Sequence, residues 1–211
     1  MEKLPISLCV ISHNSGSKLL ELIEKHRDLV SEVIVLDQGS TDGTEDLLKG
    51  EVDVFVKRRH KGFCEPDREY CFSLAKNEYV LNLDDDEELS QELKEKLPTL
   101  IKSRGDIFFF KRKNLVDGVD IHELMGDDIQ PRLWKRGSLR WGVKLHEYPE
   151  PALNTKVFFI NENIVHKRTL EGLKKSNKAR NRIADDLNHQ KQVNFVAAVE
   201  DYVSKKRGED A

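Results

Sequence analysis

Short apolar runs alternate with helical patterns along the first 165 residues of the chain. Six runs rich in branched and aromatic residues predict strands at 6–11, 32–37, 52–56, 78–84, 106–111 and 156–160. Apolar residues at helical spacing predict helices at 17–30, 44–50, 67–77 and 90–103. Strands that read as nearly continuous apolar runs, and that alternate with helices, indicate a mostly parallel sheet with right-handed crossovers.

The rest of the chain reads as a tail. Because no internal repeat or low-complexity linker interrupts the alternation, we expect one α/β domain over residues 1–165 and a helical tail over 166–211. Between residues 167 and 182 the tail carries seven basic side chains against one acid. Such a stretch either faces anionic lipid or an acidic acceptor, or is a solvated helix face. The final "SKKRGEDA" lacks a helix-ending signal, which fits a fragment of a longer protein.

Composition narrows the class of protein. With 211 residues, 38% hydrophobic and 35% charged, and a net charge of −3, the chain reads as globular rather than fibrous or nucleic-acid-coating. No apolar run approaches the roughly 20 residues that span a bilayer, and "MEKLPISLCVISHN" lacks a signal peptide's layout. We therefore expect a cytoplasmic protein, or one at the membrane surface. Cys9, Cys64 and Cys71 show no CxxC spacing, which indicates packed thiols rather than disulfides or a zinc site.

Polar residues gather where three of the predicted strands end. "SHN" (12–14) follows the first strand, "DQGSTDGT" (37–44) the second, and "DDD" (84–86) the fourth. In parallel sheets, ligands bind outside the carboxyl ends of the strands. One such end is explained by an ordinary turn, but three ends of one sheet predict a ligand site.

The last of these ends begins a run of five acids, residues 84–88. Adjacent carboxylates repel one another unless water or a cation offsets the repulsion. If the strand stays extended, Asp84 and Asp86 project to one face and Asp85 to the other. Mg²⁺ or Mn²⁺ commonly binds through one or two carboxylates together with substrate phosphates. Glu87 and Glu88 are instead predicted to start the following helix, with Ser90 as its N-cap.

Three motifs carry a resemblance to a known family: "PISLCVISHN", "EVIVLDQGSTDGT" and "EYVLNLDDDEEL", in this order and at these intervals. They resemble the nucleotide-diphospho-sugar glycosyltransferases of the GT-A fold, family 2. Weaker likenesses, in "GFCEPDREYCFSLA", "RLWKRGSLRWGVKLHE" and "IVHKRT", are similar to the lipopolysaccharide core glucosyltransferase-like branch. The resemblance implies an α/β GT-A fold with helices on both faces of the sheet. It also implies metal-dependent, usually inverting transfer of a sugar, from a UDP-sugar by family habit, to a glycan or lipid-linked hydroxyl.

The resemblance assigns a metal site for Mn²⁺ or Mg²⁺. Asp86 should touch the metal directly, and Asp84 should reach it through water or hold the donor's ribose. Asp85 is expected to be a bystander. His166 in "IVHKRT" resembles the late histidine that completes the metal site in relatives, and imidazole is an acceptable Mn²⁺ ligand. The alternative is a histidine packed at the end of a strand.

The nucleotide is assigned in the same way. The resemblance points to Ser12, Asn14 and Asp37 for the base and ribose, although Asp37 also reads as a turn former. Arg68 stands where relatives carry a basic residue near the diphosphate, and a guanidinium suits phosphate oxygens. The chain departs from the family here, since it reads "EPDRE" after an apparent insertion, with Glu69 at the place of an Asn.

Inversion requires a base that takes the proton of the acceptor hydroxyl. Glu147, in "KLHEYPE", matches the His-Glu pair of the branch. Asp127 and Asp128 are rivals, and all three also read as ordinary surface acids. Trp134 and Trp141 flank this region either as a sugar-stacking wall or as packing residues.

Two other classes of protein remain as alternatives. A nucleotidyltransferase that makes nucleotide sugars would begin with a glycine-rich phosphate loop followed by Arg, which "ISHNSGSK" does not supply. A non-catalytic nucleotide- or cation-binding module is the second alternative, but the acids lack the spacing of an EF-hand loop.

Overall fold

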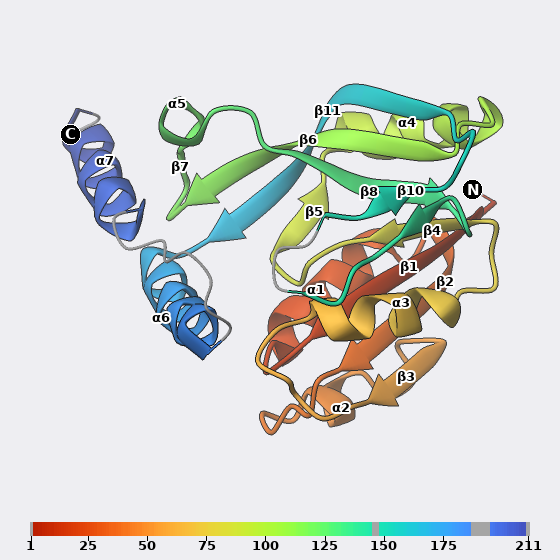
Figure 1. The fold of residues 1–211 in the computed structure, drawn as a ribbon, viewed down its shortest axis with the longest axis horizontal. Coiled ribbons are helices and arrows are strands. Elements are labelled where there is room, and N and C mark those ends of the chain that lie inside the picture. The colour runs from red at the N-terminus through yellow and green to blue at the C-terminus, as the bar shows by residue number, and fades with distance from the viewer. Residues whose placement is uncertain (1, 145–147, 187–194, 210–211) are drawn as a thin grey trace. The chain divides into compact units, whose positions relative to one another are not determined.

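The computed structural model describes residues 2–144, 148–186 and 195–209 as an α/β protein (Figure 1). The strands are β1 (Leu4–Ser12), β2 (Val30–Asp37), β3 (Val54–Lys57), β4 (Tyr79–Asn82), β5 (Glu87–Leu89), β6 (Ile107–Val116), β7 (Val119–Asp120), β8 (Ile129–Lys135), β9 (Leu139–Arg140), β10 (Glu150–Pro151) and β11 (Val157–Arg168). The helices are α1 (Gly16–His26), α2 (Thr44–Leu47), α3 (Glu65–Ser73), α4 (Gln91–Lys102), α5 (His122–Met125), α6 (Leu170–Asp186) and α7 (Phe195–Glu209). Each predicted strand and helix of the first 165 residues is present, with its ends shifted.

The chain divides into two compact units. The first contains residues 1–111 and 129–164, and the second contains 112–128 and 165–211. The second unit has an apolar core of its own, made by Val116, Ile121, Leu173, Val199 and Val203. Segment 112–128 therefore belongs with the C-terminal helices by its contacts, and the boundary at residue 165 stays a prediction.

The large sheet has the strand order β3-β2-β1-β4-β8-β6-β11-β5, with β7 paired to β6. β1 pairs in parallel with β2 on one side and β4 on the other, and β2 pairs in parallel with β3. β8 is antiparallel to both β4 and β6. The chain leaves β1 toward β2 and returns to its other side as β4, which creates the crevice where ligands bind in α/β sheets. The alternation of strands and helices predicted parallel pairing. In this sheet the parallel strands are β3, β2, β1 and β4.

Apolar side chains lie on both faces of these strands in the first unit. On one face Leu8 and Val10 pack with Leu19 and Ile23 of α1 and with residues of α4. On the other face Cys9 packs with Cys71 and Phe72 of α3. Alternate side chains of β1 thus enter different cores, as the period of a strand requires. This confirms helices on both faces of the sheet and explains why the strands read as unbroken apolar runs.

Two expectations about the ends of secondary-structure elements are wrong. Glu87 and Glu88 do not start a helix, because they form β5; α4 begins at Gln91, and its predicted N-cap Ser90 does accept a hydrogen bond from Leu93 N at 3.2 Å. The tail is not helical from Lys167, because β11 continues to Arg168 and α6 starts at Leu170.

The strand β8 is an element that the sequence analysis missed. The sequence analysis left this segment without an element, because Pro131 and Arg132 interrupt its apolar pattern. It is nevertheless the strand that joins the parallel and antiparallel parts of the sheet.

The basic tail forms intramolecular ion pairs where its side chains are described. Lys174 pairs with Glu200 at 2.6 Å and Lys175 with Glu171 at 2.7 Å. These exposed pairs fit a solvated helix face, and each contributes little stability. Within the described residues, no helix combines the length and apolar composition needed to cross a bilayer. Residues 187–194 of the tail lie outside the described residues.

His26 joins α1 to β5. Its ring is fully buried, Nδ1 donates to Leu22 O at 2.7 Å, and Nε2 accepts from Leu89 N at 3.2 Å. Burial lowers the pKa of His26 to about 4, against the opposing effect of the Leu22 carbonyl. The ring is therefore neutral in the folded protein, and it must be neutral for Nε2 to accept.

We expect His26 to make the folded protein acid-sensitive. Because its pKa is lower in the folded state, its contribution to stability is complete above about pH 6.5 and is lost as the pH falls toward 4. By pH 5 the loss should be about 2 kcal/mol at most. Urea unfolding from about pH 7 to about pH 4.5 should show a steeper decline for the wild type than for His26→Gln. Parallel curves for the two proteins would contradict the assignment.

Candidate active site

The acidic run leaves β4 in a turn rather than in an extended strand. β4 ends at Asn82, and Glu87 N donates to Asp84 O at 3.0 Å. The turn places Asp84, Asp85 and Asp86, which we call the acid turn, between β4 and β5. The argument that Asp84 and Asp86 share one face of a strand is therefore wrong. In a turn the neighbouring carboxylates can meet different partners, which reduces their mutual repulsion.

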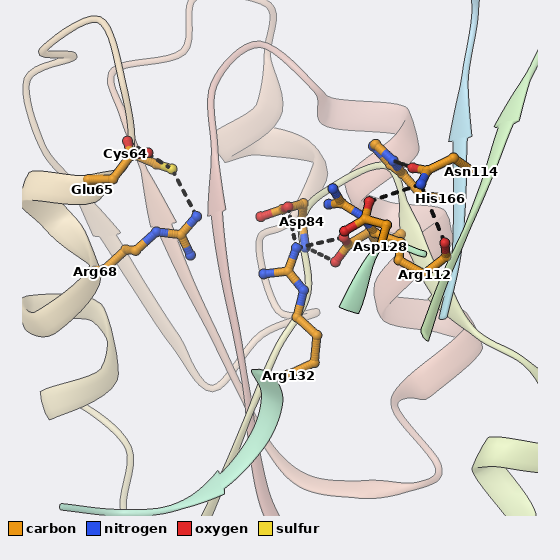
Figure 2. A network of polar contacts seen from close by, with 10 residues as sticks. Cys64, Glu65, Arg68, Asp84, Arg112, Asn114, Asp128, Arg132 and His166 are labelled. Carbon is orange, nitrogen blue, oxygen red and sulfur yellow. Dashed lines mark hydrogen bonds and ion pairs between the residues drawn. The ribbon is translucent and has the colours of Figure 1, made fainter. Parts of the chain in front are cut away.

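Arg132 of β8 binds the first acid of this turn (Figure 2). Its Nη2 lies 2.6 Å from Asp84 Oδ2 and 2.6 Å from Glu87 Oε1, and Asp84 N donates to Glu87 Oε2 at 3.1 Å. With its amide oxygen facing the guanidinium, Asn82 accepts from Arg132 Nη1 at 2.9 Å. Arg132 and Glu87 are buried, and the two carboxylates keep the pKa of Arg132 raised despite burial. This cluster holds both ends of the acid turn, and sequence reasoning missed its arginine.

Asp85 points toward the loop after β1. Ser12 Oγ donates to its Oδ2 at 3.4 Å. Burial, and after it the neighbouring Asp86 and Asp84, raises the pKa of Asp85 to about 6, although a hydrogen bond from Ser15 lowers it. Asp85 therefore connects the polar end of β4 with that of β1. Its side chain does not simply face solvent.

The loops after β1 and β2 exchange hydrogen bonds. Asn14, in the left-handed region at φ 54°, accepts from Thr41 N at 2.8 Å through its side chain, and its own N donates to Ser40 Oγ at 2.8 Å. Asp42 Oδ2 accepts from Gly16 N at the start of α1 at 3.2 Å. Ser12 and Asp37 are register partners in β1 and β2. The structure thus brings together Ser12, Asn14 and Asp37, the predicted nucleotide residues.

Asp37 is fully buried at the end of β2. Its Oδ2 accepts from Gly39 N at 3.1 Å and Ser40 N at 2.9 Å, and Ser40 Oγ donates to its Oδ1. These bonds are typical of a residue that stabilises a turn, which is one of the two roles that the sequence left open for Asp37. Its contact with the nucleoside stays a prediction.

A stacked pair of histidines lies beside these loops. The rings of His13 and His60 are parallel within 4°, with centroids 4.1 Å apart. His13 Nδ1 donates to Gln38 O at 2.9 Å, and Gln38 Nε2 donates to the buried Asp67 at 2.8 Å. Burial and the neighbouring His13 lower the pKa of His60. The sequence analysis singled out neither histidine, and the "SHN" strand end was the one signal that pointed here.

Arg68 of α3 lies over Trp141. Its guanidinium carbon is 4.6 Å from the ring centroid, its Nη2 donates to Cys64 Sγ at 3.3 Å, and Asn82 accepts from its Nη1 at 3.3 Å. Glu69, the residue after Arg68, accepts a hydrogen bond from Trp141 N and so helps to hold the backbone of the tryptophan. Burial raises the pKa of Cys64 to about 11, so the thiol is neutral.

Three buried N–H groups around Arg68 have no hydrogen-bond partner among the described residues: Arg68 Nε, Arg132 Nε and Trp141 Nε1. Trp134 is buried, and Trp141 packs against it with ring centroids 5.6 Å apart. Trp134 is therefore a core residue, and Trp141 lies at the border of the core.

His166 belongs to the second unit, where its ring is buried at the end of β11. Its Nδ1 lies 2.6 Å from Asn114 Oδ1, and Asn114 Nδ2 donates to Asp128 Oδ2 at 2.9 Å. Arg112 Nε donates to the same Asp128 oxygen at 2.7 Å (Figure 2). Asp128 is thus held by two donors, whereas Asp127 is exposed. The predicted base Glu147 lies outside the described residues.

The metal prediction can be compared with the donor atoms that are present. Among the described residues, no group of three or more His, Cys, Asp or Glu side chains is arranged to hold a metal. Mg²⁺ and Mn²⁺ do not require such a cage, since they bind through one or two carboxylates, water and substrate phosphates. The half-buried Asp86 and its neighbours supply oxygen donors of this type. The residues present are therefore chemically suited to such a cation.

Comparison with known proteins shows the family to which the chain belongs. Residues 7–149 match the model described as glycosyl transferase family 2. The lipopolysaccharide core biosynthesis glycosyltransferase LpsC of Rhizobium meliloti (strain 1021) is 28% identical over 162 residues, covering 72% of this chain and 59% of that protein. Abequosyltransferase RfbV of Salmonella typhimurium (strain LT2) is 29% identical over 134 residues, covering 56% and 38%. The chain spans 59% or less of the length of these relatives.

Solved structures give the same fold. S. aureus TarS in complex with UDP has a TM-score of 0.57 at 14% identity, covering 83% of this chain and 64% of that one. Glucosyl-3-phosphoglycerate synthase from Mycobacterium tuberculosis in complex with phosphoglyceric acid has a TM-score of 0.50 at 17% identity, covering 89% and 81%. These likenesses confirm the predicted GT-A fold.

Arg132 should be required for the acid turn to fold. Arg132→Met leaves Glu87 buried without its cation, so we expect a loss of about 3 to 5 kcal/mol in unfolding free energy. The double variant Arg132→Met/Glu87→Met removes both charges and should recover most of that loss. Arg27→Met, at the partly exposed Arg27–Asp53 pair, is the matched control and should cost about 1 kcal/mol or less. Equal losses in the two single variants by urea unfolding would contradict this role.

Proposed function

Because the chain belongs to glycosyl transferase family 2, we propose that it transfers a sugar from a nucleotide diphosphate donor to an acceptor hydroxyl, with inversion at the anomeric carbon. One observation carries the proposal: the polar ends of β1, β2 and β4 meet, with Ser12 paired to Asp37 in register and bonded to Asp85. They meet at the switch point of the sheet, where α/β proteins bind nucleotides.

The nucleotide would lie against the loops after β1 and β2. We assign Ser12, Asn14 and Asp37 to the base and ribose. The hydrogen bonds between the two loops support a preformed surface, which lowers the entropic cost of binding. S. aureus TarS, which shares the fold, was solved with UDP, and this supports uridine diphosphate as the donor nucleotide.

Arg68 would bind the diphosphate. Its guanidinium is held by Trp141 and Asn82, so little side-chain freedom is lost when a ligand binds. The N–H groups of Arg68, Arg132 and Trp141 that find no partner among the described residues support an acceptor-rich ligand here, because buried donors normally have partners. Phosphate oxygens or sugar hydroxyls would satisfy them.

We assign a Mn²⁺ or Mg²⁺ requirement to the acid turn. Asp86 would ligate the cation, and Asp84, which Arg132 holds, would contribute through water or bind the ribose. When bound, such a cation stabilises the negative charge that develops on the leaving nucleoside diphosphate. A metal-ligand role for His166 stays a prediction.

The base and the acceptor complete the proposal. Glu147 would take the proton of the acceptor hydroxyl as it attacks the anomeric carbon. The names of LpsC, a lipopolysaccharide core enzyme, and RfbV, an abequosyltransferase, support a glycan or lipid-linked acceptor. Contact of the basic tail with a membrane surface, and action in the cytoplasm, are part of this proposal.

Metal-dependent UDP binding is the first test. Calorimetry should show UDP binding with Mn²⁺ and much weaker binding in EDTA, and Asp86→Ala should weaken metal-dependent binding about tenfold or more, which is about 1.4 kcal/mol. Glu88→Ala is the matched control, because this acid of the same run pairs with Lys25 at 2.6 Å. Wild-type binding by Asp86→Ala would remove the metal assignment. Preference for a triphosphate would favour a nucleotidyltransferase, and indifference to nucleotide would favour a cation-binding module.

The assignment of the base predicts a selective loss of turnover. Glu147→Gln keeps the size of the side chain and removes its basicity, so transfer should fall about 10²–10⁴-fold. Release of UDP from a UDP-sugar in the presence of acceptor measures this rate, and calorimetry with UDP and Mn²⁺ should be nearly unchanged. Full turnover in Glu147→Gln, with loss in Asp127→Asn or Asp128→Asn, would transfer the role to one of those acids.

A further inference from the structure

Four segments of the first unit meet at the edge of the large sheet where β4, β6 and β11 begin and β8 ends (Figure 1). They are residues 74–78, 102–106, 135–138 and 152–156, and we call them the basic edge. Six basic side chains lie in these segments against two acids: Lys76, Lys102, Arg104, Lys135, Arg136 and Lys156, with Glu78 and Asp106. The whole chain has a net charge of −3, so positive charge is concentrated here.

Hydrogen bonds hold the four segments together. Asp106 N donates to Lys156 O at 3.0 Å, and Asp106 Oδ2 accepts from Lys156 N at 2.8 Å. Ser138 Oγ donates to Asp106 O at 2.9 Å. Arg136 N donates to Glu78 O at 2.9 Å, which adds the segment before β4. The basic edge is therefore one connected surface rather than four separate loops.

The acids of the basic edge do not neutralise its cations. Glu78 pairs with Lys135 at 2.9 Å, and the carboxylate of the second acid accepts from a backbone N–H. Lys102, Arg104 and Lys156 are exposed and form no ion pair with another described residue. Their charge is available to a partner, and an anionic partner is the complementary one.

An apolar side chain accompanies these cations. Leu153 is 95% exposed. Its turn is ordered, since Ala152 N donates to Ser138 O at 2.9 Å and Thr155 Oγ1 donates to Ala152 O at 3.0 Å. A face that is only solvated gains nothing from such a leucine. Basic side chains together with exposed apolar ones suit the interface of an anionic bilayer, which offers both phosphates and hydrocarbon.

We propose that the basic edge binds the surface of a bilayer containing anionic lipid, with Leu153 entering the bilayer and the three cations without ion pairs binding lipid phosphates. A second copy is a poorer occupant, because a two-fold contact would place the same cations against one another. The acid turn follows β4 and the basic edge precedes it, so docking leaves the proposed donor site uncovered. This inference deepens the membrane contact of the proposed function and rests on it for the presence of a membrane, whereas vesicle binding requires no transfer.

Co-sedimentation of the full chain with vesicles tests the contact. Vesicles of equal parts phosphatidylcholine and phosphatidylglycerol should bind the protein at low salt, and both added salt and pure phosphatidylcholine should weaken binding. Each basic side chain near an anionic surface strengthens binding about fivefold. The edge variant Lys102→Gln/Arg104→Gln/Lys156→Gln should therefore weaken it about tenfold or more.

The tail supplies a matched control. Lys174→Gln/Lys175→Gln/Lys178→Gln removes the same charge from exposed positions of α6 and should weaken vesicle binding less than the edge variant does. Urea unfolding of both variants should match the wild type, because the substituted side chains are exposed. Wild-type vesicle binding by the edge variant would overturn the proposal. An equal loss in the two variants would also overturn it, because total charge would then explain binding.

A fluorescent label tests whether Leu153 enters the bilayer. Cys9 and Cys71 are buried, and Cys64 is a neutral, half-buried thiol, so a new exposed thiol in Leu153→Cys should take the label. Nitrobenzoxadiazole at this position should brighten on addition of the anionic vesicles. The same label in Leu47→Cys, at a 46% exposed position of α2, should not. Equal brightening at both positions would overturn the orientation proposed for the basic edge.

The remaining outcomes separate this inference from its rivals. A wild-type protein that does not bind anionic vesicles overturns it. A dimer that dissociates in Leu153→Ser, without vesicle binding, overturns it and assigns the basic edge to a second copy. A protein that binds vesicles through the basic edge but does not bind UDP with Mn²⁺ overturns the proposed function and leaves the lipid contact standing.

Discussion

Arg132 carries a positive charge into the interior where β4 ends and the acid turn begins, and much of the site depends on how that charge is met. Moving a guanidinium out of water is costly, and the cost is offset by two carboxylates at 2.6 Å together with Asn82. The same contacts keep Asp84 and Glu87 close despite their like charge. Because both ends of the turn are held, Asp85 reaches Ser12, and the acid turn is joined to the end of β1.

The fold was predictable where burial decides the pattern. β1, β2 and β4 are buried on both faces, so their sequences are nearly all apolar and were recognised as strands. β8 was not recognised, because Pro131 and Arg132 stand where an apolar run would continue. β5 was taken as the start of a helix, because carboxylates before Ser90 satisfy local capping rules. In both cases a long-range ion pair, between Arg132 and Glu87, outweighs the local preference.

The candidate site was predictable in its location and less so in its contacts. Polar strand ends marked Ser12 and Asp37, the last residues of β1 and β2, and Asn14 just after β1, because α/β sheets bind ligands at that edge. The prediction that Asp84 and Asp86 project to one face was wrong, because side chains alternate between faces only while a strand stays extended, and the chain turns here. The stacking of His13 on His60 and the bond between Asn114 and His166 join residues far apart in sequence. Local patterns carry no information about such pairs.

The loops after β1 and β2 constrain each other's length. Asn14 binds Ser40 and Thr41 of the second loop, and Asp42 of that loop binds Gly16 after the first. An inserted residue in either loop would move an acceptor away from a donor in the other, so both sets of bonds would fail together. The two loops therefore act as one structural unit, although 26 positions separate Asn14 from Ser40.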